Sequence, residues 1–341
     1  MFKTEYEISS SSLSSRRSSL ASVLSSSSVS TFAQNTCQST SLSNPNADEF
    51  ALQECIKIIK SNVEDVVTNK ANKNEKKWWI DGNYKFIDEK RLPLILVEDV
   101  SYKEFEKKCE RANASRFWEY RSGTVIIIEL PKRDHEVTHG EFVRQFLNAF
   151  SNLQYQDRVR CTGAITCSAT PEHIARGSKQ ADASFVPRLL PIPSQNPCDS
   201  EGTPWPTVIV EVADSQSLAS IIQKTTQFWL APDRCEDVII LKLWKWNRTY
   251  HNGIPRRRLT VRTSPQNGDV NYLPVQIIEF GTIDGENRLY NRCSAPGMCT
   301  LRISPHCIYR GCPHQNPPLP QYPFENDVII DLFLIQQEII N

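Results

Sequence analysis

The spacing of apolar residues predicts an alternation of helices and strands over the middle of the chain. A capping-box pattern that begins at Ser101 predicts a helix that ends near Asn113, because a serine there can accept a hydrogen bond from a free amide of the first turn. Branched residues on either side of Ser122 and Gly123 predict a hairpin over 117–130. These two elements open the predicted core.

Two further helices and three strands follow in the predicted core. Phenylalanines recur at four-residue intervals over 139–153, which is helical spacing, and 215–230 is a second predicted helix. Short apolar runs predict strands over 182–186, 207–212 and 238–246. The predicted order is therefore helix, hairpin, helix, strand, strand, helix, strand.

The chain ahead of this core has a different pattern. Serine dominates residues 1–45 and large apolar residues are sparse, so we expect a disordered tail. Apolar residues three or four apart predict an amphipathic helix over 48–67, and a charged linker follows it. Residues 46–98 are therefore expected to form an N-terminal helix and linker ahead of a core over 99–250.

The last part of the chain, 251–341, is predicted to be an extension of mixed structure. Strand candidates lie at 259–263 and 275–280, and an apolar pattern predicts a helix over 327–340. A cysteine- and proline-rich stretch separates them. The pattern leaves open whether these segments extend the core or form a separate lobe.

Composition narrows the class of protein. The 341 residues include 39 basic and 39 acidic side chains, so no broad positive field can hold nucleic acid and any grip must be local. No run of about 18 apolar residues is present to span a bilayer, and the polar start has no secretion-signal pattern. We therefore expect an intracellular protein, cytoplasmic or nuclear, with no membrane partner; a homo-oligomer is left open.

The eleven cysteines are spread from Cys37 to Cys312 and are expected to be reduced thiols. The C-terminal part has residue types that can bind zinc. They are Cys293, Cys299, His306, Cys307, Cys312 and His314. Because their gaps lack paired CxxC knuckles, a structural Zn²⁺ is the less favoured interpretation.

Four polar residues in the core have the chemistry of phosphodiester hydrolysis. Asp182 begins a strand, Glu211 interrupts an apolar strand, and Glu119 lies on the first strand of the hairpin. Lys224 lies on the helix after Glu211, about two and a half turns along it. Carboxylates hold Mg²⁺ beside a phosphate, and a lysine offsets the charge that develops.

At these positions the chain resembles the family called "putative restriction endonuclease", a branch of the PD-(D/E)XK nuclease superfamily. The order and spacing of the matching pieces agree over about 130 residues. These are Glu119 to Gly123, His139 with Gly140, Ala181 to Pro187, Val208 to Val212, and Lys224 with Phe228. Ala181 replaces a proline of the family pattern and Ala213 takes its lysine position.

The resemblance implies an α/β fold of mixed α+β type, with a restriction-endonuclease-like central mixed sheet flanked by helices. It implies Asp182 and Glu211 as ligands of Mg²⁺ or Mn²⁺, and DNA as the substrate. Lys224 would then replace the family's lysine from the following helix, and Glu119 is a further candidate catalytic residue. His139 opens a helix in the family pattern and receives no catalytic step.

Each of these residues also has an ordinary structural explanation. An unpaired Glu211 carboxylate in a buried strand would cost several kcal/mol, so a salt bridge, for example to Lys224, is an alternative to a metal. Glu119 could pair with Arg121 in the hairpin. The alternative function is therefore a catalytically inactive nuclease-fold protein that binds or acts as a scaffold.

A basic group is formed by Arg256 and the two arginines that follow it, with tryptophans shortly before them. It is either a phosphate-facing patch or a solvated loop.

Overall fold

The computed structural model describes most of the chain after residue 68. The described ranges are 69–111, 115–168, 178–193, 196–199, 201–265, 275–313, 322–323 and 326–341. The predicted serine-rich tail and the predicted helix over 48–67 lie outside them.

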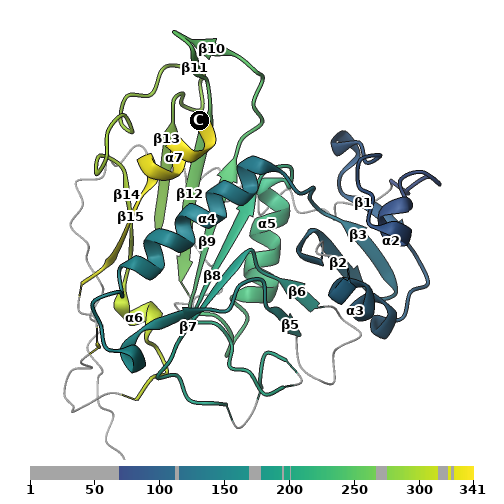
Figure 1. The fold of residues 1–341 in the computed structure, drawn as a ribbon, viewed down its shortest axis with the longest axis horizontal. Coiled ribbons are helices and arrows are strands. Elements are labelled where there is room, and N and C mark those ends of the chain that lie inside the picture. Colours follow the sequence, from purple (N-terminus) through teal and green to yellow (C-terminus); the bar gives the residue numbers. More distant parts are fainter. Residues whose placement is uncertain are drawn as a thin grey trace, which may run out of the picture. The chain divides into compact units, whose positions relative to one another are not determined.

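A six-stranded sheet forms the centre, in the order β13-β12-β9-β8-β7-β4 (Figure 1). In chain order these strands are β4 (Val159–Cys161), β7 (Ala183–Pro187), β8 (Val208–Ala213), β9 (Asp237–Leu243), β12 (Arg258–Pro265) and β13 (Gln276–Gly281). The pair β8 and β9 is parallel and every other neighbouring pair is antiparallel. The expected α/β fold with a central mixed sheet flanked by helices is confirmed.

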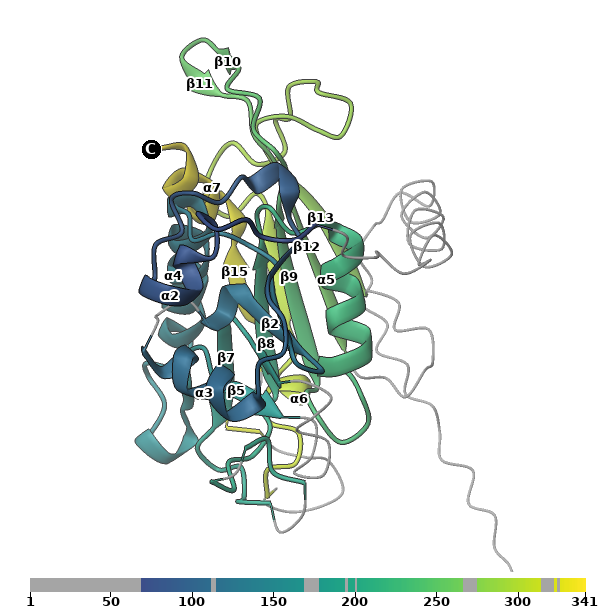
Figure 2. The same cartoon turned by 90° about the vertical axis from the view of Figure 1, so that its right-hand side faces the viewer.

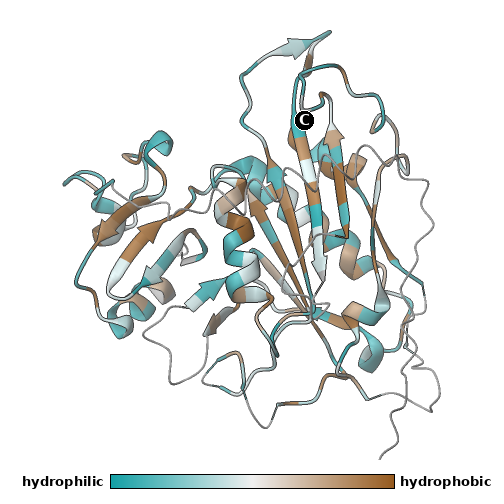
Figure 3. Cartoon of the chain, turned by 180° about the vertical axis from the view of Figure 1, so that it is seen from behind, coloured by the Kyte–Doolittle hydropathy of each residue, from teal (hydrophilic) through white to brown (hydrophobic). Residues whose placement is uncertain are grey.

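Helices cover both faces of this sheet, as Figure 2 shows. Helix α4 (Arg133–Asn148) and helix α7 (Leu332–Ile340) lie on one side, and α5 (Leu218–Lys224), continued by a π-helical turn over Thr225–Trp229, lies on the other. Apolar residues concentrate along the central strands (Figure 3). The buried cluster between the sheet and α4 includes Phe142, Phe146, Phe185, Val210 and Leu241. The cluster between the sheet and α5 includes Ile209, Ala213, Ile221, Trp229 and Ile240.

Three predicted helices differ from the observed ones. The helix predicted over 139–153 begins earlier, at Arg133, because its polar first turn is held by contacts to other segments and carries no apolar periodicity. The helix predicted over 215–230 begins three residues later, at Leu218, because the Ser217 side chain caps it. The helix predicted over 327–340 is a strand, β15 (Val328–Asp331), followed by α7, because its branched residues pair with β14 (Thr300–Ile303).

The strands after residue 250 belong to the central sheet, which the sequence had left open. The predicted strands over 259–263 and 275–280 are β12 and β13, and β12 pairs with β9 from Leu259 opposite Leu243 onward. Helix α6 (Pro305–Ile308) follows β14. Beyond the end of β9 the chain turns back through a short hairpin, β10 (Tyr250–His251) and β11 (Ile254–Pro255).

A second, three-stranded antiparallel sheet is built from residues before α4. Its order is β1-β3-β2. The strands are β1 (Leu94–Val97), β2 (Trp118–Arg121) and β3 (Thr124–Ile127), with helices α2 (Lys77–Asp81) and α3 (Tyr102–Arg111) beside them. Ser122 and Gly123, both at positive φ, make the predicted turn between β2 and β3. This sheet has its own buried cluster around Trp78, Leu94 and Trp118.

Small elements complete the described chain. A two-stranded ribbon, β5 (Thr166–Ser168) with β6 (Ser178–Gln180), lies against β2. Short 3-10 turns occur at Glu89–Arg91, Ser115–Phe117 and Tyr155–Asp157. Within the described ranges, no helix combines the length and apolar character that crossing a membrane requires.

Candidate active site

Strand register places Asp182 and Glu211 side by side. Ala183 of β7 pairs with Val210 of β8, so Asp182 is the residue opposite Glu211, and the Asp182 amide donates to the Val210 carbonyl at 3.2 Å. Directly opposite residues of an antiparallel pair have Cβ atoms roughly 5 Å apart. The two predicted metal ligands are therefore neighbours where β7 begins, close enough for the Asp182 charge to raise the pKa of Glu211, although Asp182 contacts α4 and Glu211 contacts α5.

Glu211 is buried, with only 3% of its surface exposed, and is held by two side chains from the helix that follows β8. The Lys224 Nζ lies 2.7 Å from Oε1 and 2.9 Å from Oε2. The Trp229 indole N–H donates to Oε1 at 2.6 Å. Burial, with the Asp182 charge nearby, raises the pKa of Glu211 to about 7, although Lys224 opposes this. The salt bridge to Lys224 that the sequence offered as an alternative is thus present.

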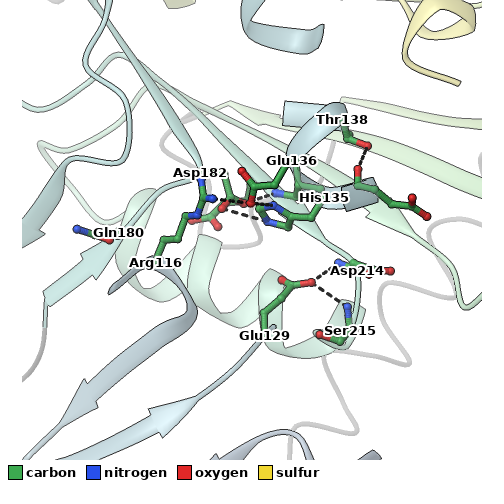
Figure 4. A network of polar contacts seen from close by, with 12 residues as sticks. Arg116, Glu129, His135, Glu136, Thr138, Gln180, Asp182, Asp214 and Ser215 are labelled. Carbon is green, nitrogen blue, oxygen red and sulfur yellow. Dashed lines mark hydrogen bonds and ion pairs between the residues drawn. The ribbon is translucent and has the colours of Figure 1, made fainter. Parts of the chain in front are cut away.

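Asp182 is also buried, with 6% of its surface exposed, yet it is held as an anion. Its Oδ2 accepts a hydrogen bond from the Val212 amide at 2.6 Å, and its Oδ1 lies 3.2 Å from Nε2 of His135 (Figure 4). Burial alone would raise the pKa of Asp182, but the His135 charge, the hydrogen bonds and Lys224 lower it to about 2. The two neighbouring carboxyl groups therefore differ strongly in acidity.

His135 is a site residue that the sequence analysis did not identify. It lies in the first turn of α4, and Nδ1 is 3.3 Å from Glu136, which in turn pairs with Arg116. Burial opposes its protonation, but the Asp182 carboxylate raises the pKa of His135 well above its usual 6.5. His139, which the family resemblance had emphasised, is one turn further along, and burial lowers its pKa. The i, i+4 spacing of the two histidines was the signal that could have found this residue.

Glu129 is the second residue that the sequence analysis missed. Its Oε1 accepts hydrogen bonds from the amides of Asp214 at 2.6 Å and Ser215 at 2.8 Å, in the loop that follows β8 (Figure 4). Burial raises the pKa of Glu129 to about 7. The signal was the same as for Glu211, an acidic residue after a run of isoleucines. Glu129 thus fixes the loop next to the carboxylate pair.

Glu119 and Lys224 occupy different kinds of position. Glu119 lies on β2, where Arg121 at 2.7 Å and Lys179 pair with its carboxylate. It therefore has the structural partner that the sequence suggested, Arg121, and a second one as well. Lys224 contacts Glu211 directly, and its Nζ also donates to the Gln180 carbonyl at 2.8 Å.

The donor chemistry of the pair fits a hard divalent cation. Mg²⁺ in proteins keeps several waters and needs only one or two carboxylates, and the mutual repulsion of Asp182 and Glu211 is the kind of strain that a cation relieves. Within the described ranges, no group of three or more histidine, cysteine, aspartate or glutamate side chains could hold a metal ion. A metal here would therefore rest on these two carboxylates, with water and substrate oxygens as its other ligands. Of the proposed zinc ligands, His314 lies outside the described residues.

A cavity of about 240 Å³ lies next to the site. Lys179 and Gln180 of β6 line one side of it, and Trp118, Tyr102 and Phe105 line another. Gln180 connects the cavity to the site, because its carbonyl accepts the hydrogen bond from Lys224. Gln180 thus both lines the cavity and contacts Lys224.

Replacing His135 by glutamine should lower the free energy of unfolding by about 2 kcal/mol near pH 6, since the Asp182 anion loses a charged hydrogen-bond partner. A histidine whose pKa is raised by folding stabilises fully below its unfolded value, here 6.5, and this stabilisation fades as the pH rises through the folded value. The difference between the two proteins should therefore shrink at alkaline pH. Urea unfolding from about pH 6 to pH 9 measures it, and a difference independent of pH would contradict this account.

No family model matches the sequence, and no curated protein matches it either. Among solved structures, the chain is similar to one described as a "putative nuclease belonging to DUF820" from Anabaena variabilis. The two are 15% identical, with a TM-score of 0.33, and the match covers 53% of this chain and 84% of the other. Similarity at this level is too low to identify a family or a function.

Proposed function

We propose that this chain is a metal-dependent endonuclease that hydrolyses phosphodiester bonds of DNA. The observation that carries the proposal is the register of β7 and β8, which makes Asp182 and Glu211 neighbours, with Lys224 in contact with Glu211. Two carboxylates and a lysine at the end of a central strand are the groups that metal-assisted phosphodiester cleavage requires. The proposed ligands of Mg²⁺ or Mn²⁺ are Asp182 and Glu211.

The chain's own residues would divide the work as follows. When bound, the metal supplies Lewis-acid activation of a phosphate oxygen and of the attacking water. His135 and the Val212 amide hold Asp182 ionised and fixed in direction. The Trp229 indole holds the Glu211 carboxylate, and Lys224 places a positive charge beside it, where negative charge develops on the phosphate.

Metal removal tests this proposal. Supercoiled plasmid incubated with the protein should be nicked in the presence of Mg²⁺ or Mn²⁺, left intact in EDTA, and cut again when Mg²⁺ is restored. Ca²⁺ should support DNA binding with much slower cleavage, because its larger, more flexible coordination orients the water less well. Cleavage that persists unchanged in EDTA would exclude a metal mechanism.

A catalytically inactive binding protein is the second candidate. It is favoured by the state of the two carboxylates, which are almost fully buried and already satisfied by protein donors. Such a protein should bind DNA yet leave it intact with Mg²⁺ and with Mn²⁺ at any protein concentration. Titration of Mn²⁺ followed by paramagnetic resonance separates the two candidates further, because only the nuclease needs the ion to bind at this pair.

A further inference from the structure

The hairpin β10–β11 with its two connecting segments, residues 245–257, forms an arm that extends past the end of the central sheet. Asn252 and Gly253 both have positive φ and make its two-residue turn. Tyr250 is 56% exposed and Ile254 51% exposed. Figures 1 and 2 show the hairpin projecting away from the sheet. The arm therefore presents an aromatic and an aliphatic side chain to its surroundings.

The arm lies in the most basic stretch of a chain whose net charge is zero. From residue 238 to 265 there are seven lysines and arginines and no aspartate or glutamate. They are Lys242, Lys245, Arg248, Arg256, Arg257, Arg258 and Arg262. Arg257 pairs with Asp134 and Arg258 with Glu279, whereas Lys245 and Arg248 are exposed and form no ion pair within the described part of the chain. These two cations are the ones presented to a ligand.

The base of the arm is one wall of a cavity of about 600 Å³. Its lining includes His251 and Arg256 of the arm, Tyr290, and Phe333 and Gln336 of α7, and none of the described residues that line it is an aspartate or glutamate. Gln336 is 4% exposed, its Nε2 donates to the Cys293 carbonyl at 3.2 Å, and its Oε1 has no hydrogen-bond partner among the residues that the structure describes. A buried amide oxygen without a donor favours a ligand that brings an N–H group.

The arm and the proposed active site share one end of the sheet. Ala213, at the end of β8, pairs with Lys242 near the end of β9, and the arm leaves β9 immediately afterwards. Arg257, at the base of the arm, lies 2.8 Å from Asp134, the neighbour of His135 in α4. A polymer that contacts the arm therefore lies at the same end of the sheet as the carboxylate pair.

We propose that the arm and its cavity bind a single strand of nucleic acid, with phosphates on Lys245 and Arg248 and one unstacked base in the cavity. A cavity of this size holds a nucleotide, its basic wall suits a phosphate, and Gln336 Oε1 would accept from a base amino or imino group. A base paired in a duplex cannot enter. This inference deepens the proposed function and rests on it for the class of polymer.

Binding in EDTA tests the arm without cleavage. A labelled single strand of about 16 nucleotides is titrated by anisotropy between about 50 and 200 mM salt. Replacing Lys245 and Arg248 together by glutamine should reduce the salt slope by about 1.4 and the affinity about 25-fold near 0.1 M salt, since each phosphate contact on a single strand contributes about 0.7 to the slope. The matched control replaces Lys85 and Lys90, exposed lysines of the other sheet region, by glutamine and should leave both values unchanged. An equal loss in both proteins overturns the proposal.

The cavity is tested by filling it. Leu289 lines the cavity and is 49% exposed, so Leu289→Trp adds bulk there without disturbing the buried core. The unaltered protein should prefer the single strand to the matching duplex, and the variant should lose that preference. Equal binding of both forms by the unaltered protein would overturn the inference. A second result would also overturn the inference. If a nucleoside 5′-monophosphate binds, its binding is unaffected by the arm substitutions, and the strand does not bind, the ligand is a free nucleotide.

The result for strand binding is separate from the result for cleavage. Strand binding that depends on the arm, in a protein that never cleaves DNA, supports this inference and defeats the proposed endonuclease. Metal-dependent cleavage with strand binding that is unchanged when the arm residues are replaced supports the proposed endonuclease and defeats this inference.

Discussion

Asp182→Asn should reduce metal-dependent DNA cleavage at least about a thousandfold, the largest functional effect that we expect from a single substitution. A bound metal supplies several kcal/mol of transition-state stabilisation, and about 4 kcal/mol corresponds to a factor of a thousand. Asparagine preserves the shape of the side chain and can still accept from the Val212 amide, so the loss reports the missing charge. Rates of plasmid nicking at saturating Mg²⁺ measure it.

The sheet provides a matched control at Asp237. This aspartate is also buried, at the start of β9, and burial raises its pKa to about 7. It pairs in register with Val208, so it lies at the other end of the parallel pair from Ala213 and Lys242. Asp237→Asn should leave cleavage close to that of the unaltered protein. Equal losses in the two variants would mean that any buried aspartate of the sheet matters only for folding.

Lys224→Met should lower the free energy of unfolding by about 3–5 kcal/mol at pH 8, in addition to abolishing cleavage. Removing one partner of a buried ion pair leaves the other charge uncompensated, here on Glu211. The pKa of Glu211, already about 7, should rise further. An acid whose pKa is raised by folding lowers stability as the pH climbs from its unfolded value, here 4.5, through its folded value. The loss should therefore be much smaller near pH 5, as measured by urea unfolding in EDTA.

The double substitution Lys224→Met with Glu211→Gln separates stability from activity. Neutral side chains of similar shape in place of a buried ion pair are often tolerated, so most of the lost stability should return. Cleavage should not return, because a proposed metal ligand and the lysine are both absent. A double variant as unstable as Lys224→Met alone would show that the lysine matters through packing instead of charge.

Local periodicity accounts for the elements that were predicted correctly. The hairpin around Ser122 and Gly123, and the strands that became β7, β8 and β9, carry patterns read from a few neighbouring residues. The strand β15 was read as a helix because its apolar run continues into α7 without a break. Its strand conformation depends on pairing with β14, about 30 residues earlier in the chain, and no local pattern contains that information.

The same limit applies to the candidate site. The sequence pointed to Asp182, Glu211 and Lys224 because acidic residues at or inside apolar strands require an explanation. It did not identify His135 or Glu129, whose partners are 47 and 85 residues away in the chain. Its catalytic role for Glu119 stays a prediction, and the structure shows the Glu119 carboxylate paired with Arg121 and Lys179.

The sequence by itself determined which apolar faces of the core strands and helices are covered and that a glutamate inside an apolar strand must have a charged or polar partner. Only the tertiary structure decided which partners those are: the register that places Asp182 opposite Glu211, the lysine and indole that hold Glu211, and the histidine that holds Asp182. The physical reason is that periodicity reports the burial of one face of an element, whereas the identity of a contact depends on where distant segments meet.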